Sequence, residues 1–145
     1  MIFQRERASE ILAEIILLTE KHHKQCSRFV EIPLDPNYQL YLDAEKLGRL
    51  CVFTARKGSK LCGYAVFFIQ PHPHYSKTIQ AFCSLLFIDP EYRGAGMRFI
   101  RFCDEALASE GVEIISHTVT TQMDYSKLLQ RLGYEPAELI FERKI

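Results

Sequence analysis

The sequence predicts a mixed α/β fold of three layers, with helices on both faces of a central sheet, in a single domain over residues 1–145. Helical and strand patterns alternate along the chain, which is typical of this architecture. A β-hairpin in the middle makes the sheet mixed, because a hairpin joins antiparallel strands. No linker rich in proline, glycine or serine divides the chain, and 145 residues is an ordinary size for one domain.

Two helices are expected in the N-terminal third. From Ser9, a candidate N-cap, apolar residues recur every three or four positions as far as His22, which predicts an amphipathic helix. Residues 32–36, Ile-Pro-Leu-Asp-Pro, end this helix because proline lacks the N–H that a helix needs. A shorter helix is expected over residues 37–47, ending at Gly48.

Strand patterns occupy the middle of the chain. Residues 50–55 and 61–69 are rich in β-branched and aromatic side chains and flank Gly58, so they predict a hairpin. A loop is expected over residues 70–75. Residues 79–88 then form a nearly unbroken apolar run of strand length, which predicts a central strand.

The last third repeats the alternation. It predicts a helix over residues 97–110, a strand over residues 112–119, and a short helix that Asp124 caps and Gly133 ends. A final strand is expected over residues 139–145. Because its apolar edge would be exposed, it could pair two copies of the chain, and a homodimer is therefore an open expectation.

Composition excludes several classes of function. The chain carries 18 basic and 18 acidic side chains, whereas nucleic-acid binders usually have a basic excess, so no nucleic-acid partner is expected. No uncharged apolar run reaches the roughly 18 residues that cross a bilayer, and the N-terminus lacks a signal-peptide core. We therefore expect no membrane association and a cytoplasmic location. The five cysteines form no C-x-x-C pair, which argues against disulfides and a metal site.

One segment carries a chemical signal. Residues 91–96, Glu-Tyr-Arg-Gly-Ala-Gly, lie between the predicted central strand and a helix. The first N–H groups of a helix lack partners and its dipole favours anions, while Gly94 and Gly96 let the backbone approach a phosphate closely. No Walker sequence follows, and Phe99 occupies the third glycine position of a dinucleotide fingerprint. The alternative is a plain turn between strand and helix.

Three stretches resemble the GNAT superfamily of acetyl-CoA-dependent N-acetyltransferases: residues 86–96, the helix that follows, and residues 128–134, Leu-Leu-Gln-Arg-Leu-Gly-Tyr. The resemblance implies a central, mostly antiparallel sheet with splayed central strands, flanked by helices. It also implies direct transfer of an acetyl group from acetyl-CoA to a primary amine. The N-terminal half resembles small phage-encoded members of the superfamily.

The resemblance further implies a site for acetyl-CoA as co-substrate. The backbone of the central strand would pair with the pantetheine arm in a gap between the fourth and fifth strands, and the amides of the following loop would bind the pyrophosphate. The residues implied for this site are Leu86, Phe87, Ile88, Arg93, Gly94, Ala95, Gly96, Met97 and Arg98.

The sequence departs from the family pattern at two positions. Arg98 stands where the family has glycine or alanine, so its side chain either crowds the pyrophosphate or neutralises it. Leu129 stands where the family often has a tyrosine general acid. Tyr125, one helical turn earlier, is either a substitute acid or a core aromatic. Catalysis does not require the acid, because a thiol with a pKa near 8.5 leaves tolerably as its anion.

The general base is also open. Residues 79–88 contain no carboxylate that could serve as the base. Gln80 stands roughly where histone-modifying members of the family resemble each other in carrying a glutamate. Histidines are the remaining acceptors near neutral pH. His117 lies in the strand that should splay from the central one, and His74 lies with His72 in the loop before it; each is equally well explained as a structural residue. The catalytic candidates are therefore His117, Tyr125 and His74.

Other candidates have weaker support. The pair His22-His23 is better explained as a helix C-terminus, where imidazolium favours the dipole. Glu31 is an outside candidate for the base, and Cys83 is a small core residue rather than a nucleophile. The departures leave a second hypothesis open, namely a non-catalytic module that holds coenzyme A or a protein partner. The acceptor, a small molecule or a protein amine, is not identified.

Overall fold

The computed structural model describes residues 1–145 and contains a single five-stranded sheet. The strands lie in chain order across the sheet; β1 to β4 are antiparallel neighbours, and β5 is parallel to β4. The sheet is therefore mostly antiparallel, as expected. The strands are β1 (Ile2–Glu6), β2 (Leu50–Lys57), β3 (Lys60–His72), β4 (Tyr75–Ile88) and β5 (Ile114–His117).

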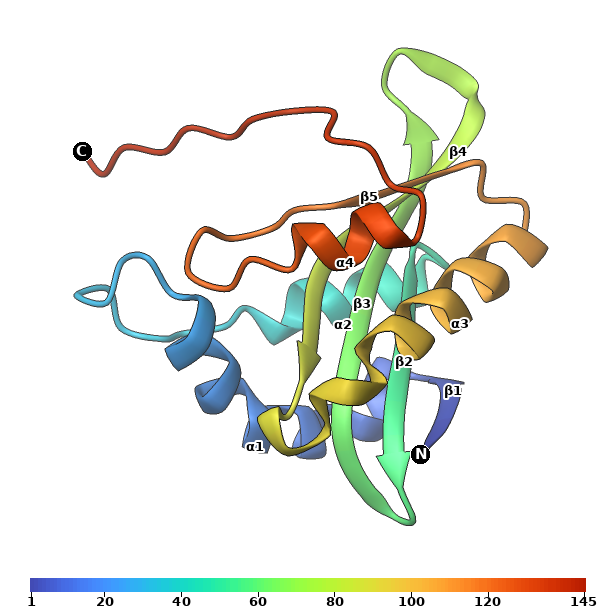
Figure 1. Cartoon of the computed structure of the whole chain (residues 1–145). Coiled ribbons are helices and arrows are strands. Elements are labelled where there is room, and N and C mark those ends of the chain that lie inside the picture. The colour runs from blue at the N-terminus through green and yellow to red at the C-terminus, as the bar shows by residue number, and fades with distance from the viewer.

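Helices cover both faces of the sheet, which gives the three layers (Figure 1). One face packs against α1 (Ala8–Cys26), with α2 (Tyr38–Lys46) at its side, and the other face packs against α3 (Gly96–Ser109), as the two buried clusters show. No helix is long and apolar enough to cross a membrane. The remaining helices are the 3₁₀ helix η1 (Pro90–Ala95) and α4 (Ser126–Arg131).

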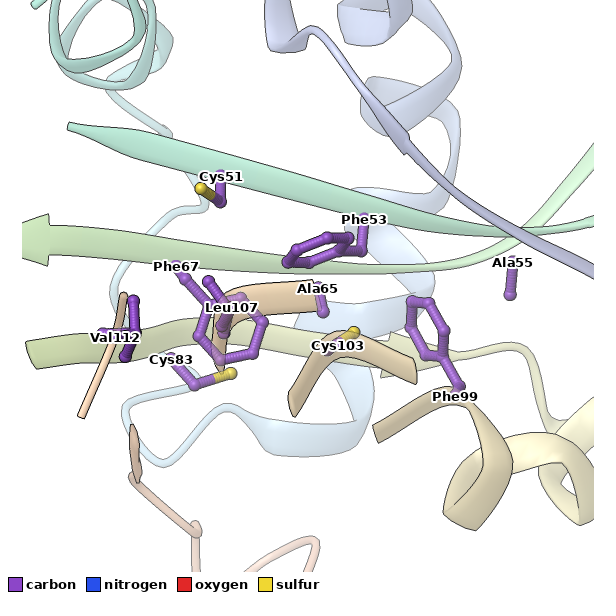
Figure 2. Close-up of a cluster of buried hydrophobic side chains, with 11 residues drawn as sticks. Cys51, Phe53, Ala55, Ala65, Phe67, Cys83, Phe99, Cys103, Leu107 and Val112 are labelled. Atoms are coloured by element: carbon purple, nitrogen blue, oxygen red, sulfur yellow. The ribbon is translucent and has the colours of Figure 1, made fainter. Parts of the chain in front are cut away.

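The larger buried cluster joins β2, β3 and β4 to α3 (Figure 2). Phe53 and Phe67 of the sheet meet Phe99 and Leu107 of α3, all of them fully buried. Cysteine side chains fill the smaller gaps in this core. Burial raises the pKa of Cys83, so its thiol stays protonated and behaves as a small apolar group, as the sequence suggested.

The feature of the sheet that positions the site is a fork between β4 and β5. These two strands pair only from Gln80 to Cys83. At the same place the β3–β4 register shifts, because Phe67 faces Cys83 while Val66 faces Leu85, which leaves Ser84 as an extra residue. Such a bulge bends a strand and increases its twist. Beyond Ser84, β4 is paired on one side only.

Several predicted boundaries are corrected by the structure. β1 was not predicted, although it pairs with β2 over its whole length. The loop predicted over residues 70–75 is a two-residue turn at Pro73 and His74, because β3 and β4 both extend into it. Ser9 is not the N-cap of α1; Arg7 holds that position, and the Glu45 carboxylate accepts the N–H groups of Ala8 and Ser9.

The predicted final strand is wrong. Residues 132–145 form no strand, and Leu139, Phe141 and Ile145 are at least 84% exposed. Strand propensity needs a neighbouring strand to act on, and β5, the edge strand, offers only four residues. Ion pairs hold the tail instead to the segment after α1, from Arg28 to Glu142 at 3.5 Å and from Lys144 to Glu31 at 2.9 Å.

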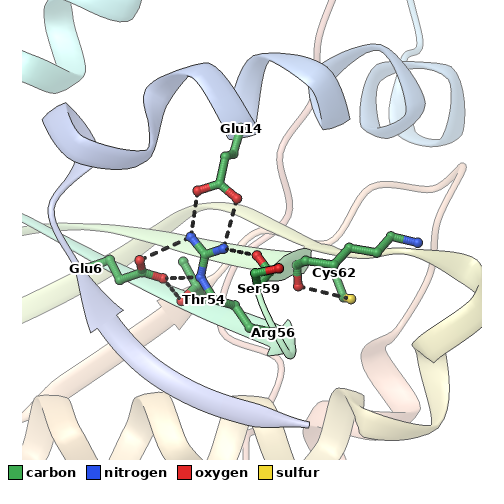
Figure 3. Close-up of polar contacts among 7 residues, drawn as sticks. Glu6, Glu14, Thr54, Arg56, Ser59 and Cys62 are labelled. Atoms are coloured by element: carbon green, nitrogen blue, oxygen red, sulfur yellow. Dashed lines mark hydrogen bonds and ion pairs between the residues drawn. The ribbon is translucent and has the colours of Figure 1, made fainter.

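Arg56 of β2 holds β1 and α1 against the sheet (Figure 3). Its guanidinium donates to Glu6 and Glu14 at 2.8 Å each, and to the carbonyl of Ser59 at 2.8 Å. Thr54 also donates to Glu6. Burial by itself would raise the pKa of Glu6, but the hydrogen bonds from Arg56, Gln4 and Thr54 outweigh it and lower the pKa to about 2.

We predict that Arg56→Met lowers the free energy of unfolding by about 3 kcal/mol, because it leaves a shielded carboxylate without its partner. The side chains of Arg56 and Glu6 are only 11% and 18% exposed. Arg5→Met is the matched control, since Arg5 pairs with Glu110 at 47% and 42% exposure and such pairs contribute less than about 1 kcal/mol. Urea unfolding measures both; equal losses would contradict the assignment.

Candidate functional site

The connection from β4 to α3 is fixed to α1 at two points. The buried Asp89 carboxylate accepts the N–H of Glu91 at 3.2 Å and the ammonium of Lys21 at 2.9 Å. Four residues later, Arg93 donates to the side-chain oxygen of Gln25 at 2.9 Å. The Lys21 hydrogen bond lowers the pKa of Asp89, so the carboxylate is charged at neutral pH. The loop that precedes α3 is therefore held in one position beside the fork.

The first turn of α3 has no side-chain cap. Its N-cap is Ala95, and no acidic residue lies in the first turn. The Gly96 amide is already used, since it donates to the carbonyl of Arg93. Arg98 lies in this turn, exposed and without an ion-pair or hydrogen-bond partner. The helix dipole disfavours a cation at this end. A bound anion would remove that conflict, and no protein carboxylate does so.

The two glycines of the loop have different surroundings. A Cβ added to Gly94 would meet nothing within 4 Å. A Cβ on Gly96 would lie 3.6 Å from Leu128 and 3.7 Å from Ile88, so this glycine faces α4 and the end of β4. The sequence suggested that both let a phosphate approach. In the structure only Gly94 faces open space.

The predicted pantetheine-binding stretch, Leu86 to Ile88, lies on the free arm of the fork. Its partners on the β3 side run from Ala65 to Gly63, and β5 does not reach it on the other side. An extended chain with amide groups, placed along this edge, would find the backbone donors and acceptors of a strand. The residues present therefore fit the arm of coenzyme A.

His117 is the last residue of β5 and faces Cys83 at the base of the fork. Its ring makes edge contacts with Phe67, Tyr125 and Tyr134, at centroid distances of 5.8, 6.3 and 5.1 Å. Both ring nitrogens are buried without a hydrogen-bond partner. Burial lowers the pKa of His117 to about 4, so the ring is neutral at pH 7.

The structure brings Tyr125 to the same place but not His74. Tyr125 is the N-cap residue of α4, and its hydroxyl donates to the carbonyl of Thr118 at 3.3 Å. Burial raises its pKa, so the phenol stays protonated. His74 lies in the exposed β3–β4 turn, where its backbone N–H donates to Nδ1 of His72. This turn is at the opposite end of β4 from the fork (Figure 1).

A cavity of about 390 Å³ lies on the opposite face of the sheet, between α1, α2 and residues 27–36. Its sheet side is formed by Leu50, Val52, Tyr64, Val66 and Leu85. Leu85 is the first residue after the bulge, so the cavity reaches the fork. The sequence did not predict this cavity, because residues from several distant segments form it.

His22 of α1 lines this cavity. The sequence predicted that the pair His22-His23 ends the helix, and this is wrong. α1 continues to Cys26, and His22 is buried. Its Nδ1 lies 2.8 Å from the hydroxyl of Tyr64, and its ring stacks on Phe87 at 5.1 Å. Burial, with a smaller effect of His23, lowers the pKa of His22 to about 4. The apolar spacing of the helix already placed His22 on the inward face.

Comparison with known proteins gives a family. The sequences of the "Acetyltransferase (GNAT) family" match residues 17–134 of the chain. No curated protein matches the sequence significantly.

Solved structures of acetyltransferases share the fold at low identity. An aminoglycoside acetyltransferase from an uncultured soil metagenomic sample has a TM-score of 0.74 at 15% identity, over 99% of this chain and 95% of that one. A predicted acetyltransferase with acetyl-CoA from Clostridium acetobutylicum has a TM-score of 0.71 at 8% identity, over 99% and 95%. A ribosomal-protein-alanine N-acetyltransferase from Brucella melitensis biovar Abortus 2308 has a TM-score of 0.72 at 11% identity, over 100% and 99%.

We predict that the free energy of unfolding falls by about 2 kcal/mol per buried histidine between pH 7 and pH 5. His22 and His117 take up protons near pH 6.5 when unfolded but only near pH 4 when folded, so acid favours the unfolded chain. Glu6, with its pKa lowered to about 2, loses its contribution only at lower pH. Urea unfolding of His117→Phe should show about half the pH slope of the natural chain; an unchanged slope would contradict the burial of this ring.

Proposed function

The chain belongs to the GNAT acetyltransferase family, and from this premise we propose that it transfers the acetyl group of acetyl-CoA directly to a primary amine. The observation that carries the proposal is the fork beyond Ser84, whose free β4 edge leads through η1 to the first turn of α3, which has no side-chain cap. The free edge of β4 suits the amide-containing pantetheine arm of acetyl-CoA. The first turn of α3 suits its pyrophosphate.

The residues that would hold acetyl-CoA follow from this arrangement. The backbone of Leu86 to Ile88 would pair with the pantetheine arm. The loop around Gly94 and the first turn of α3 would face the pyrophosphate, with the Arg98 guanidinium as a charged donor. Arg98 replaces the small residue of the family at this position, and its exposed, unpaired side chain supports neutralisation of a phosphate rather than crowding.

The reaction needs no covalent enzyme intermediate. The neutral amine nitrogen attacks the thioester carbonyl carbon, the new C–N bond forms, and the C–S bond breaks with its electron pair on sulfur. The nitrogen gives up one proton and the sulfur takes up one, so the charges balance. A backbone N–H of β4 near Phe87 would stabilise the intermediate oxyanion, a contribution of about 3 kcal/mol in comparable sites.

Of the three side chains expected from the sequence, only Tyr125 has a chemical role in this proposal. Tyr125 and His117 lie together at the base of the fork. Of the two, the protonated Tyr125 hydroxyl would be the proton donor for the sulfur. His74 has no role in it, because the β3–β4 turn lies at the other end of the sheet. The thiolate leaves without help, so Tyr125→Phe should lower kcat only modestly.

We predict that Arg98→Ala weakens acetyl-CoA binding about tenfold, since a charge-assisted hydrogen bond is worth roughly 1.5 kcal/mol or more. Arg49→Ala is the control, because Arg49 is also an exposed arginine but precedes β2 at the opposite end of the sheet from η1. Calorimetry should give a micromolar Kd for the natural chain. Equal losses in both variants, or no binding at millimolar acetyl-CoA, would exclude the anion site.

Turnover is tested separately, by release of coenzyme A thiol and by the intact mass of the amine after incubation. We expect thiol release that depends on an added primary amine, and a mass gain of one acetyl group on that amine. Binding of acetyl-CoA without thiol release from a broad amine panel would instead support a module that holds coenzyme A without catalysis.

A further inference from the structure

We propose that the cavity under α1 is the acceptor site and that it takes a primary amine carried on an apolar body, with the amine next to His22. This inference rests on the proposed function and specifies its acceptor. It concerns the class of substrate, which neither the family nor the fold identifies.

The position of the cavity is the first argument. Leu85, which lines it, directly follows the bulge at Ser84, and Phe87 of the free β4 arm stacks on His22 at 5.1 Å. The cavity therefore ends at the segment of β4 along which the pantetheine arm would lie. An acceptor in the cavity would approach the fork from the α1 face, while α3 and α4 cover the other face.

The lining is the second argument, because it selects the body of the acceptor. Most of it is apolar, and it contains a single carboxylate, Asp35, which is exposed. Its other charged group, Arg28, is also exposed and already bonded to Glu142. A polycation would lose water here without gaining partners, whereas an aromatic or branched aliphatic body would bury its surface. The main apolar lining residues are Leu12, Ile15, Phe29, Ile32, Leu34 and Val66.

The third argument is the imidazole of His22. Tyr64 and Phe87 hold the ring, and Nε2 has no hydrogen-bond partner. Unlike the two nitrogens of His117, Nε2 is not sealed from solvent. In the tautomer whose Nδ1–H donates to the Tyr64 oxygen, Nε2 offers its lone pair to an N–H of the amine. The low pKa keeps the ring neutral, and the apolar surroundings favour the neutral, nucleophilic amine over the ammonium ion.

The first test compares acceptors of different chemistry in the thiol-release assay. The probes are 2-phenylethylamine, spermidine and a lysine-containing peptide. We expect kcat/KM for 2-phenylethylamine to exceed that of the other two at least tenfold. A preference for spermidine or for the peptide would overturn this inference and leave N-acetyl transfer itself intact.

The second test changes the wall of the cavity at Leu34, which is 39% exposed. Leu34→Glu should lower kcat/KM for 2-phenylethylamine at least tenfold and raise it for spermidine. Leu47→Glu is the matched control, because Leu47 is 70% exposed and lies outside the cavity, and it should change neither value. His22→Gln should lower kcat more than tenfold with a smaller change in KM. Wild-type kinetics in Leu34→Glu would overturn the assignment.

Binding without turnover separates this inference from the proposed function. Amide NMR spectra of the whole chain, titrated with 2-phenylethylamine in the absence of acetyl-CoA, should shift at residues that line the cavity and less in Leu34→Glu. If these shifts occur but no amine releases thiol, the proposed function fails while the apolar amine site stands. If the cavity residues do not shift, the inference is overturned whatever the turnover.

Discussion

One extra residue in β4 organises this molecule. Ser84 has no counterpart on β3, and the strand bends at that point, so β4 leaves β5 after four paired residues. The free arm beyond the bulge ends at Asp89, which starts η1 and so places the first turn of α3 beside the fork. The candidate site thus lies beside a local irregularity of β4, one of three register shifts in this sheet.

The fork divides the site between the two faces of the sheet. On the α3 and α4 face, His117 and Tyr125 close its base, and the buried imidazole nitrogens of His117 lack partners. On the α1 face, His22 is buried too, but Tyr64 holds one nitrogen and the other remains accessible. Both rings are neutral for the same reason, which is burial. Only one of them can exchange a hydrogen bond with a ligand in this arrangement.

Hydrogen bonds with side chains of α1 connect the parts of the site. Lys21 and Gln25 of α1 hold Asp89 and Arg93 of the segment before α3, so the wall of the cavity and this segment are joined through one helix. Arg56 in turn fixes the start of α1 to the sheet.

The sequence by itself determined the order of the helices and strands from α1 to α4 apart from η1, the hairpin around Gly58 and the central strand, because periodicity and turn residues act over a few neighbours. Only the tertiary structure decided what depends on distant segments. The predicted final strand does not form, because the edge strand β5 offers only four residues. Gly96 faces α4, and His22 faces a cavity that α1, α2 and the sheet enclose together. Burial, pairing and pKa are properties of neighbours in space, which the order of residues does not state.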